Sequence, residues 1–494
     1  MDFAVFYQNS LKLMFPEIFL ATSILTMTVY ASFCATIMSK PLILRSINNL
    51  ALLSLTLTSF LIFNMDKEFL TAYRDCFIFD FFSDFVKLVI IGFTILCLFI
   101  SRQNVSRLKI NSFEYILLVL SAILGLMLLV SSNDLISLYL ALEMQSLSLY
   151  VLAASKKDST FSTEAGLKYF ILGSLSSALL LFGISMLYGL TGTTNFTNFA
   201  LLFSEDLVEI ECILSIKHAL VMILVAFFFK VSAAPFHAWS PDVYEGSPTS
   251  STVFFSIVPK LGLFAILVRV FADTFYLFYD VYVIAAAVVS LVSIFVGSLG
   301  ALKQKKLKRL LAYSSISHVG YLLIGFAANS LDGFQSVFFY LIIYMLTNTL
   351  LWSILLNLEF NNNTDRSKTL VDFAFAAKSN FALGFSGLVA LFSLMGIPPF
   401  AGFAAKMFVF ASALDSSLFI VPVLGMVMSV ISSYYYLRLI KNLYFENVCM
   451  RGFVLPVSYA ASYTISFSTI LLFFFFFNPN ILYLVSYKLS LCLL

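Results

Sequence analysis

The sequence predicts an all-α polytopic membrane protein with about fourteen transmembrane helices. Of its 494 residues, 61% are hydrophobic and only 11% are charged, whereas soluble domains carry about 25% charged residues. Apolar segments of about 20 residues, long enough to cross a bilayer, recur from one end of the chain to the other. These two observations exclude a soluble globular protein.

Hydropathy predicts fourteen spans and no separate soluble domain. We place them near 16–38, 42–64, 82–101, 112–131, 134–154, 165–190, 217–239, 250–272, 276–301, 308–329, 333–358, 382–412, 417–440 and 454–486. The predicted division is an N-terminal three-helix segment (1–110), two five-helix repeats (111–275 and 276–441) and a C-terminal transmembrane helix (442–494).

Charge in the loops predicts the orientation. The loops after odd-numbered spans contain eighteen Lys and Arg residues, and those after even-numbered spans contain three. Basic loops remain on the cytoplasmic or matrix side of a membrane. Both termini are therefore expected on the opposite side, which also requires an even number of spans.

A duplication is visible at two prolines. Pro235 in the seventh span and Pro399 in the twelfth each follow small residues and precede Phe, 164 positions apart. The same shift carries spans four to eight onto spans nine to thirteen. Five is an odd number, so the second repeat is inverted, and inverted repeats with broken helices are a transporter architecture.

Four charged residues lie within apolar stretches: Glu143, Lys230, Lys260 and Lys406. An ionised group at mid-bilayer costs about 2.5–3.5 kcal/mol on insertion scales, so such residues usually mark functional sites. Their presence beside broken helices favours a protein that moves protons or ions.

Glu143 and Lys230 are expected to form a pair that regulates proton release. Burial disfavours the charged form of a side chain, and a nearby opposite charge favours it. If Glu143 approaches or leaves Lys230, the lysine therefore holds or releases its proton. The alternative is a static ion pair that only joins two helices.

The two remaining lysines extend this path. Lys260 follows Pro259 and is placed to take a proton from Lys230, while Lys406 would act on the exit side. The alternative for Lys406 is a side chain that extends to the membrane interface. Pro235, Pro398 and Pro399 are the expected helix breaks, whose free carbonyls can hold water between the lysines.

Three further residues are candidates for an accessory proton relay. His318 lies on a serine-rich stripe that can bridge Lys260 and Lys406, or it is a hydrogen-bonded packing residue. His237 lies beyond the Pro235 break, which leaves its facing open. Lys168 is either a proton uptake group or a helix-end anchor.

No feature predicts a cofactor or a nucleic-acid partner. The chain has no Gly-rich nucleotide loop, no cysteine cluster and no paired haem-ligand histidines, and its net charge is only +3. We expect no metal site. The 56 phenylalanines suggest an AT-rich organelle genome.

Five segments carry a resemblance to a known family: LALEMQSLSLYVLAASKK, FSTEAGLKYFILGSLSSALLLFG, FKVSAAPFHAWSPDVYEGSPT, KRLLAYSSISHVGY and GIPPFAGFAAKMFVF. Between about residues 135 and 410 the chain resembles the antiporter-like membrane subunits of respiratory NADH:ubiquinone oxidoreductase (complex I). The third and fourth segments are most similar to its chain 2 (subunit N) group.

The resemblance implies that Glu143, Lys230, Lys260 and Lys406 are the proton carriers. It implies a respiratory complex in which other subunits use NADH, FMN, iron–sulfur clusters and ubiquinone, and in which sister antiporter-like subunits and membrane lipids are the partners. Because animal members lack the first three spans, it also implies a plant, algal or protist mitochondrial inner membrane. The basic loops would then face the matrix and both termini the intermembrane space. The alternatives are a monovalent cation/proton antiporter subunit and a non-pumping scaffold.

Overall fold

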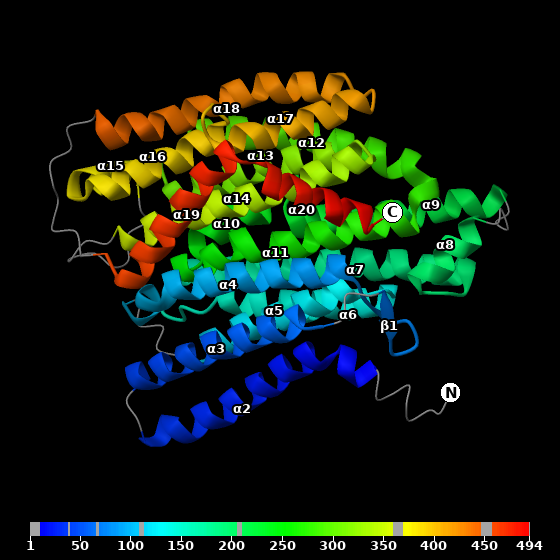
Figure 1. Cartoon of the computed structure of the whole chain (residues 1–494), viewed down its shortest axis with the longest axis horizontal. Coiled ribbons are helices and arrows are strands. Elements are labelled where there is room, and N and C mark those ends of the chain that lie inside the picture. The colour runs from blue at the N-terminus through cyan, green and yellow to red at the C-terminus, as the bar shows by residue number, and fades with distance from the viewer. Residues whose placement is uncertain are drawn as a thin grey trace.

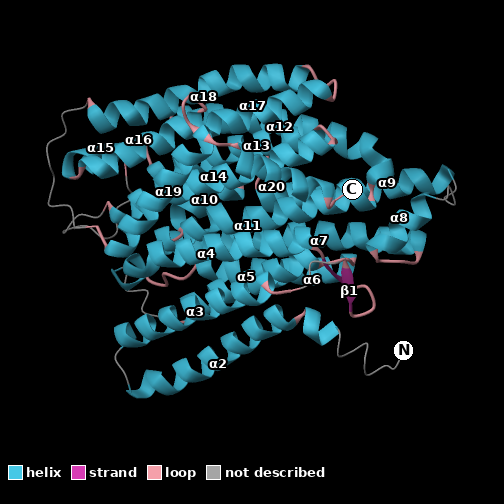
Figure 2. Cartoon of the chain, in the orientation of Figure 1, coloured by secondary structure: helices cyan, strands magenta, loops and turns pink. Residues whose placement is uncertain are grey.

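The structure, a computed structural model, describes residues 10–37, 40–65, 69–107, 113–204, 210–358, 369–445 and 457–493. These residues form helices and one small hairpin (Figure 2). In chain order the elements are α2 (Phe15–Ile37), α3 (Lys40–Phe63), β1 (Leu70–Ala72), β2 (Phe77–Phe79), α4 (Phe81–Arg107), α5 (Glu114–Ser131), α6 (Leu135–Ala153), α7 (Thr160–Thr191), α8 (Phe196–Ser204), α9 (Ile210–Val231), α10 (Trp239–Gly246), α11 (Thr249–Arg269), η1 (Val270–Thr274), η2 (Tyr276–Phe278), α12 (Tyr279–Leu302), α13 (Leu307–Ala327), α14 (Leu331–Asn357), α15 (Leu370–Ser379), α16 (Phe381–Met395), α17 (Ala401–Asp415), α18 (Ile420–Tyr444), α19 (Tyr459–Phe477) and α20 (Asn480–Leu491).

The predicted all-α membrane fold is confirmed. Thirteen helices in the described ranges are long and apolar enough to span a membrane. The predicted twelfth span is made of two half-helices, α16 and α17, on either side of the predicted break at Pro398 and Pro399. Of the basic loop residues, Lys67, Lys109, Arg366, Lys368 and Arg451 lie outside the described residues.

One local expectation was wrong, and two short elements were not predicted. The C-terminal span is not one helix over 454–486: α19 ends at Phe477 and α20 begins at Asn480, because Pro479 between them has no N–H to continue the first helix. The connection 191–216 contains the short helix α8. A β1–β2 hairpin interrupts the all-helical pattern between the second and third spans.

The helices run side by side in one bundle (Figure 1), with α2 and α3 at one edge and α18 at the other. α11, α13 and α14 form its centre. Every residue of α11 from Ser250 to Arg269 is buried. A helix that is apolar and buried all round must be enclosed by other helices, and these three helices carry most of the site described below.

The loops meet at two opposite ends of the bundle, as alternating spans require. At one end, Asn133 and Asn195 both donate amide hydrogen bonds to the carbonyl of Asp75, at 2.8 and 3.0 Å. These residues follow the fourth, sixth and second spans. At the other end, Lys306 pairs with Thr369, which joins the loops after the ninth and eleventh spans.

The two broken helices end in the same way, 164 residues apart. α9 ends at Val231 and α16 at Met395. The next residues, Ser232 (φ 65°) and Gly396 (φ 79°), are left-handed. The N–H of Ala233 then bonds the carbonyl of Phe228 at 2.9 Å, and that of Ile397 the carbonyl of Phe392 at 3.3 Å. These are Schellman-type helix ends, and their register matches the predicted repeat.

Two buried ion pairs, which the sequence analysis missed, fix the N-terminal helices. Lys87 on α4 bonds Glu17 on α2 at 2.6 Å, with side chains 1% and 3% exposed. Arg269 on α11 pairs with Asp80, just before α4, and donates to the carbonyl of Val130 at 2.9 Å. These contacts tie α2, α5 and α11 to α4.

We expect Lys87→Met to destabilise the protein by about 3–5 kcal/mol, because it leaves the Glu17 carboxylate buried without its partner. The double variant Glu17→Gln/Lys87→Met removes both charges and should recover most of that loss. The measurement is thermal unfolding of the detergent-solubilised protein. Equal stabilities of the single and double variants would contradict a buried ion pair.

Candidate functional site

Lys230 lies at the carbonyl end of a broken helix. It stands in the last turn of α9, where the free carbonyls and the helix dipole favour a cation. Its Nζ donates to the hydroxyl of Tyr150, on α6, at 3.4 Å. Gly173 on α7 makes room for this hydroxyl, since a Cβ there would lie 2.1 Å from it. Tyr150 is therefore the direct partner of Lys230.

Glu143 lies on α6 two turns before Tyr150, about 10.5 Å along the axis. It is half-buried and borders an exposed stripe that includes Leu140 and Leu147. Within the described chain no ion pair joins it to Lys230, and its Oε1 is buried without a hydrogen-bond partner. The predicted pair is thus separated in this structure, and the static-bridge alternative has no contact to support it.

A small cavity, mostly apolar but bordered by a few polar side chains, joins Lys230 to Lys260. Its volume is about 20 Å³, enough for one water molecule. Both lysines line it, together with Gln145 and Ser232, whose side-chain oxygens are buried and have no protein partner. Such a cavity, roomy and lined by unpaired polar atoms, is where an ordered water is expected.

Lys260 connects this cavity to His318 through one tyrosine. Lys260 is 4% exposed, at the middle of α11. Its Nζ donates to the hydroxyl of Tyr344 on α14 at 3.4 Å. The Tyr344 ring lies against the His318 ring, with centroids 5.0 Å apart and planes tilted by 33°.

His318, on α13, is held by two hydroxyl groups. Its Nδ1 lies 2.6 Å from the hydroxyl of Tyr340, on α14. Its Nε2 lies 3.1 Å from the hydroxyl of Tyr436, on α18. Both ring nitrogens are therefore engaged, as both relay and packing require. His318 lies between Tyr344, which contacts Lys260, and Tyr321, which contacts Lys406.

Lys406, on α17, turns back to the end of the preceding half-helix. It is 6% exposed, and its Nζ donates to the carbonyl of Met395, the last residue of α16, at 2.8 Å. It also lies over the ring of Tyr321, 5.0 Å from its centroid, and that ring is 6.0 Å from His318. Its amine is buried inside the bundle, so it does not extend to the interface.

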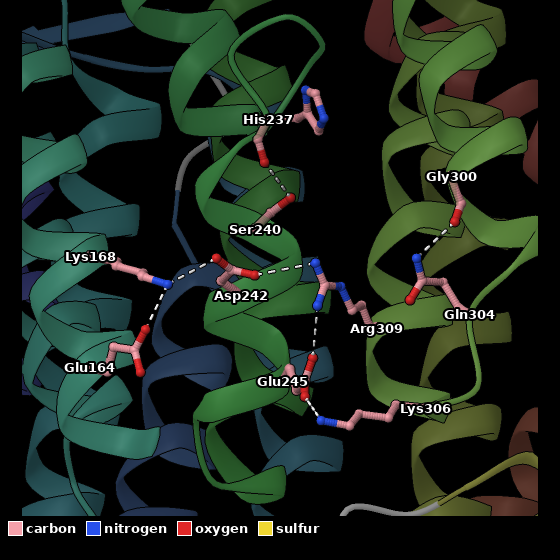
Figure 3. Close-up of polar contacts among 10 residues, drawn as sticks. All are labelled: Glu164, Lys168, His237, Ser240, Asp242, Glu245, Gly300, Gln304, Lys306 and Arg309. Carbon is pink, nitrogen blue, oxygen red and sulfur yellow. Dashed lines mark hydrogen bonds and ion pairs between the residues drawn. The ribbon is translucent and has the colours of Figure 1, made fainter. Parts of the chain in front are cut away.

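Lys168 lies in an ion-pair network at the basic end (Figure 3). It contacts Glu164 at 2.8 Å and Asp242 of α10 at 3.1 Å, and its side chain is 43% exposed. Asp242 also faces Arg309 of α13 at 3.6 Å, while Glu245 of α10 pairs with Lys306 and Arg309. The short helix α10 is thus joined by ion pairs to α7 on one side and to the start of α13 on the other.

In the described part of the chain, His237 contacts neither the row of buried side chains nor the ion-pair network of Lys168. It lies in the break between α9 and α10, away from the ion pairs in Figure 3, and its Nδ1 is buried without a partner. The structure therefore brings Lys230, Lys260, His318 and Lys406 into one row and leaves Glu143, His237 and Lys168 beside it. Sequence reasoning missed the tyrosines that connect the row, Tyr150, Tyr344, Tyr340, Tyr436 and Tyr321. For Tyr150 alone the sequence held a signal: it lies seven positions after Glu143, which places it on the same helix face.

Buried lysines at the ends of two broken helices, in a bundle of membrane-length helices, define an antiporter-like transport protein. The family model described as NADH:quinone oxidoreductase/Mrp antiporter matches residues 132–432, and the chain belongs to this family. The resemblance found in the sequence motifs is thereby confirmed.

Full-length relatives support the assignment. The chain is 39% identical to NADH-ubiquinone oxidoreductase chain 2 of Marchantia polymorpha, over 99% of each chain. It is 40% identical to NADH-quinone oxidoreductase subunit N of Paramagnetospirillum magneticum, over 94% of each. It also resembles a chain of respiratory complex I from Thermus thermophilus with bound aureothin, with a TM-score of 0.78 and 30% identity over 95% of this chain and 98% of that one.

Asp242→Asn should loosen α10 without unfolding the protein. The change removes the contacts to Lys168 and Arg309, and each such exposed ion pair stabilises by about 1 kcal/mol or less. Hydrogen–deuterium exchange should become faster in α10 while the unfolding temperature shifts little. Glu164→Gln, which removes only the contact within α7, is the control. Unchanged exchange in α10 would contradict its clamping by these pairs.

Proposed function

We propose that this chain is a proton-translocating membrane subunit of an NADH:quinone oxidoreductase. The observation that carries the proposal is the row of buried side chains that runs from Lys230 in the first repeat to Lys406 in the second. Its members are linked by hydrogen bonds, ring contacts and one water-sized cavity. A static scaffold needs charges in pairs, whereas this row joins like-charged groups through neutral hydroxyls.

Each residue in the row has a position suited to one proton transfer. Lys230 would hold the proton at Nζ and pass it through the cavity to Lys260. Lys260 would pass it to the Tyr344 hydroxyl, and from there a water molecule would have to carry it to His318, because Tyr344 contacts His318 by its ring. A water molecule would likewise be needed between His318 and Lys406, which both lie against the Tyr321 ring. Hydroxyls suit this role because they both donate and accept hydrogen bonds.

A second cavity supports an exit beyond Lys406. It has a volume of about 190 Å³, and it is lined by Ser412 and Asp415, on the same helix as Lys406, and by Asp332 and Ser336 of α14. Asp332 begins α14 and Asp415 ends α17, so both acids lie at the end of the bundle opposite the basic loops. Carboxylates beside a polar cavity can accept a proton released from the row.

Glu143 would regulate the first step. It lies at the border of the bundle, two turns from Tyr150 on α6, and its charge acts on Lys230, so a movement or charge change there alters how firmly Lys230 holds its proton. A static bridge requires an ion pair between Glu143 and Lys230, whereas a regulated pair can be apart in one state. The absence of this ion pair among the described residues fits regulation.

The placement of the chain follows from the same proposal. Electron transfer from NADH through FMN and iron–sulfur clusters to ubiquinone would occur in other subunits, and this chain would contribute only translocation. Its partners would be sister antiporter-like subunits and other membrane subunits. Likeness to a plant chain 2 supports a mitochondrial inner membrane, with basic loops in the matrix.

Lys260→Met tests the row directly. Methionine fills similar space but carries no proton, so we expect the assembled complex to translocate fewer protons per NADH oxidised. Coupled turnover should fall by on the order of tenfold or more, as for loss of a proton-transfer group. The measurement is proton uptake into vesicles, with NADH oxidation recorded in parallel.

The matched control is Glu17→Gln/Lys87→Met, which removes two buried charges outside the row. If Lys260→Met translocates the normal number of protons per NADH, the row does not carry protons and the scaffold function is favoured. The same vesicles test the remaining alternative: proton transport that requires sodium or potassium would identify a cation/proton antiporter, whereas insensitivity to both would support proton translocation alone.

His318→Gln separates relay from packing. Glutamine can still bond the hydroxyls of Tyr340 and Tyr436, but it does not take up a proton. We expect normal assembly with impaired translocation, measured in the same vesicle assay. Translocation at the wild-type ratio would make His318 a packing residue.

A further inference from the structure

A third pocket lies away from the proton row, between α3, α4 and α5 at the basic end of the bundle. Its volume is about 200 Å³. The residues that line it lie in the first half of α3, the last turns of α4 and the first turn of α5. It separates the N-terminal three-helix segment from the first repeat. Its lining is Leu44, Arg45, Asn48, Leu98, Ser101, Arg102, Gln103, Val105, Tyr115 and Ile116.

The pocket presents hydrogen-bond donors and positive charge. Arg45 and Arg102 both line it, and among the contacts of the described residues neither guanidinium has an ion-pair partner. Asn48 is only 4% exposed, yet its amide nitrogen has no hydrogen-bond partner. A buried donor without a partner costs about 1–3 kcal/mol. A ligand that supplies acceptor oxygens would satisfy it.

The ligand must therefore be anionic. The described residues that line the pocket include two arginines and no acid. Arginine binds phosphate through paired N–H groups, and basic pockets between transmembrane helices on the matrix or cytoplasmic side bind anionic head groups. The volume lies below the range of about 300–1,000 Å³ for drug-sized ligands. It suits a phosphodiester group rather than a larger molecule or a helix.

The surroundings indicate a lipid. On α3, Leu42, Leu53 and Phe60 lie on the same side as Arg45 and are 58%, 56% and 63% exposed. The pocket also contains buried apolar side chains such as Leu44 and Ile116. A lipid would place its phosphate at Arg45, Arg102 and Asn48 and its acyl chains along this apolar side of α3.

We propose that this pocket binds the head group of an anionic phospholipid. The lipid would join the N-terminal segment to the first repeat at the end where Lys87 and Glu17 do not reach. Lipid binding at this pocket is independent of proton transfer, so the experiment measures binding and not translocation.

The experiment uses the detergent-solubilised assembly that contains this chain and a photoactivatable phosphatidylglycerol. After irradiation, the labelled peptides are mapped by mass spectrometry. Label is expected on α3 and the end of α4. Unlabelled phosphatidylglycerol should compete, whereas phosphatidylcholine and inorganic phosphate should not.

Three variants make the result specific. Arg45→Gln/Arg102→Gln should lower labelling roughly tenfold or more, given the attraction per basic residue near a membrane. Arg45→Lys/Arg102→Lys keeps the charge and should retain most of it. Lys156→Gln/Lys157→Gln, in the basic loop after α6, removes the same charge elsewhere and should change nothing. A native gel shows that each variant assembles.

Several outcomes would overturn the proposal. Equal competition by phosphatidylcholine would mean ordinary surrounding lipid, and competition by inorganic phosphate would mean a free-anion site. Labelling unchanged in the double glutamine variant would place the lipid elsewhere. A photo-cross-linker at position 48 that joins this chain to another subunit would mean that protein covers the pocket.

Discussion

The rest of the site depends on two lysines held beside the breaks of two helices: Lys406, whose amine donates to a freed carbonyl, and Lys230, in the last turn before the other break. A bilayer offers no water to satisfy an ammonium group or an unpaired carbonyl. Where α16 stops, its last carbonyl accepts from Lys406, and where α9 stops, Lys230 occupies the final turn. The break after α16 thus supplies an acceptor for the Lys406 amine, whereas at the break after α9 the Lys230 amine donates to the hydroxyl of Tyr150.

The duplication explains why the two halves of the row match. Left-handed residues at Ser232 and Gly396 end the half-helices in the same register. Gly396 is needed at its position for a second reason, since a Cβ there would lie 2.8 Å from the Cδ of Lys406. Ser232 instead contributes a hydroxyl to the cavity between Lys230 and Lys260. The same backbone device therefore holds a lysine tightly in one repeat and borders a water-sized space in the other.

The spans and the charged residues could be predicted because their signals are local. A lysine inside an apolar run, or a proline after small residues, is visible within about twenty positions. The tyrosines that connect the row could not be predicted, because their contacts join distant parts of the chain. Tyr344 lies 84 residues from Lys260, and Tyr436 lies 118 residues from His318. The sequence around Tyr344, Tyr340, Tyr436 and Tyr321 carries no signal for these contacts. Lys87 was missed for the same reason, since Glu17 lies 70 residues away.

Glu143 occupies the boundary between the row and whatever adjoins this chain. Its face of α6 continues inward to Tyr150 and outward to the exposed Leu140 and Leu147. A carboxylate oxygen that is buried without a partner is costly, so a group that completes its hydrogen bonding lowers the energy of the charged state. If that group belongs to an adjoining subunit, a change there alters the field at Lys230 through one tyrosine. A separated Glu143 is therefore better suited than a bridged one to receive a signal from outside and pass it to the row.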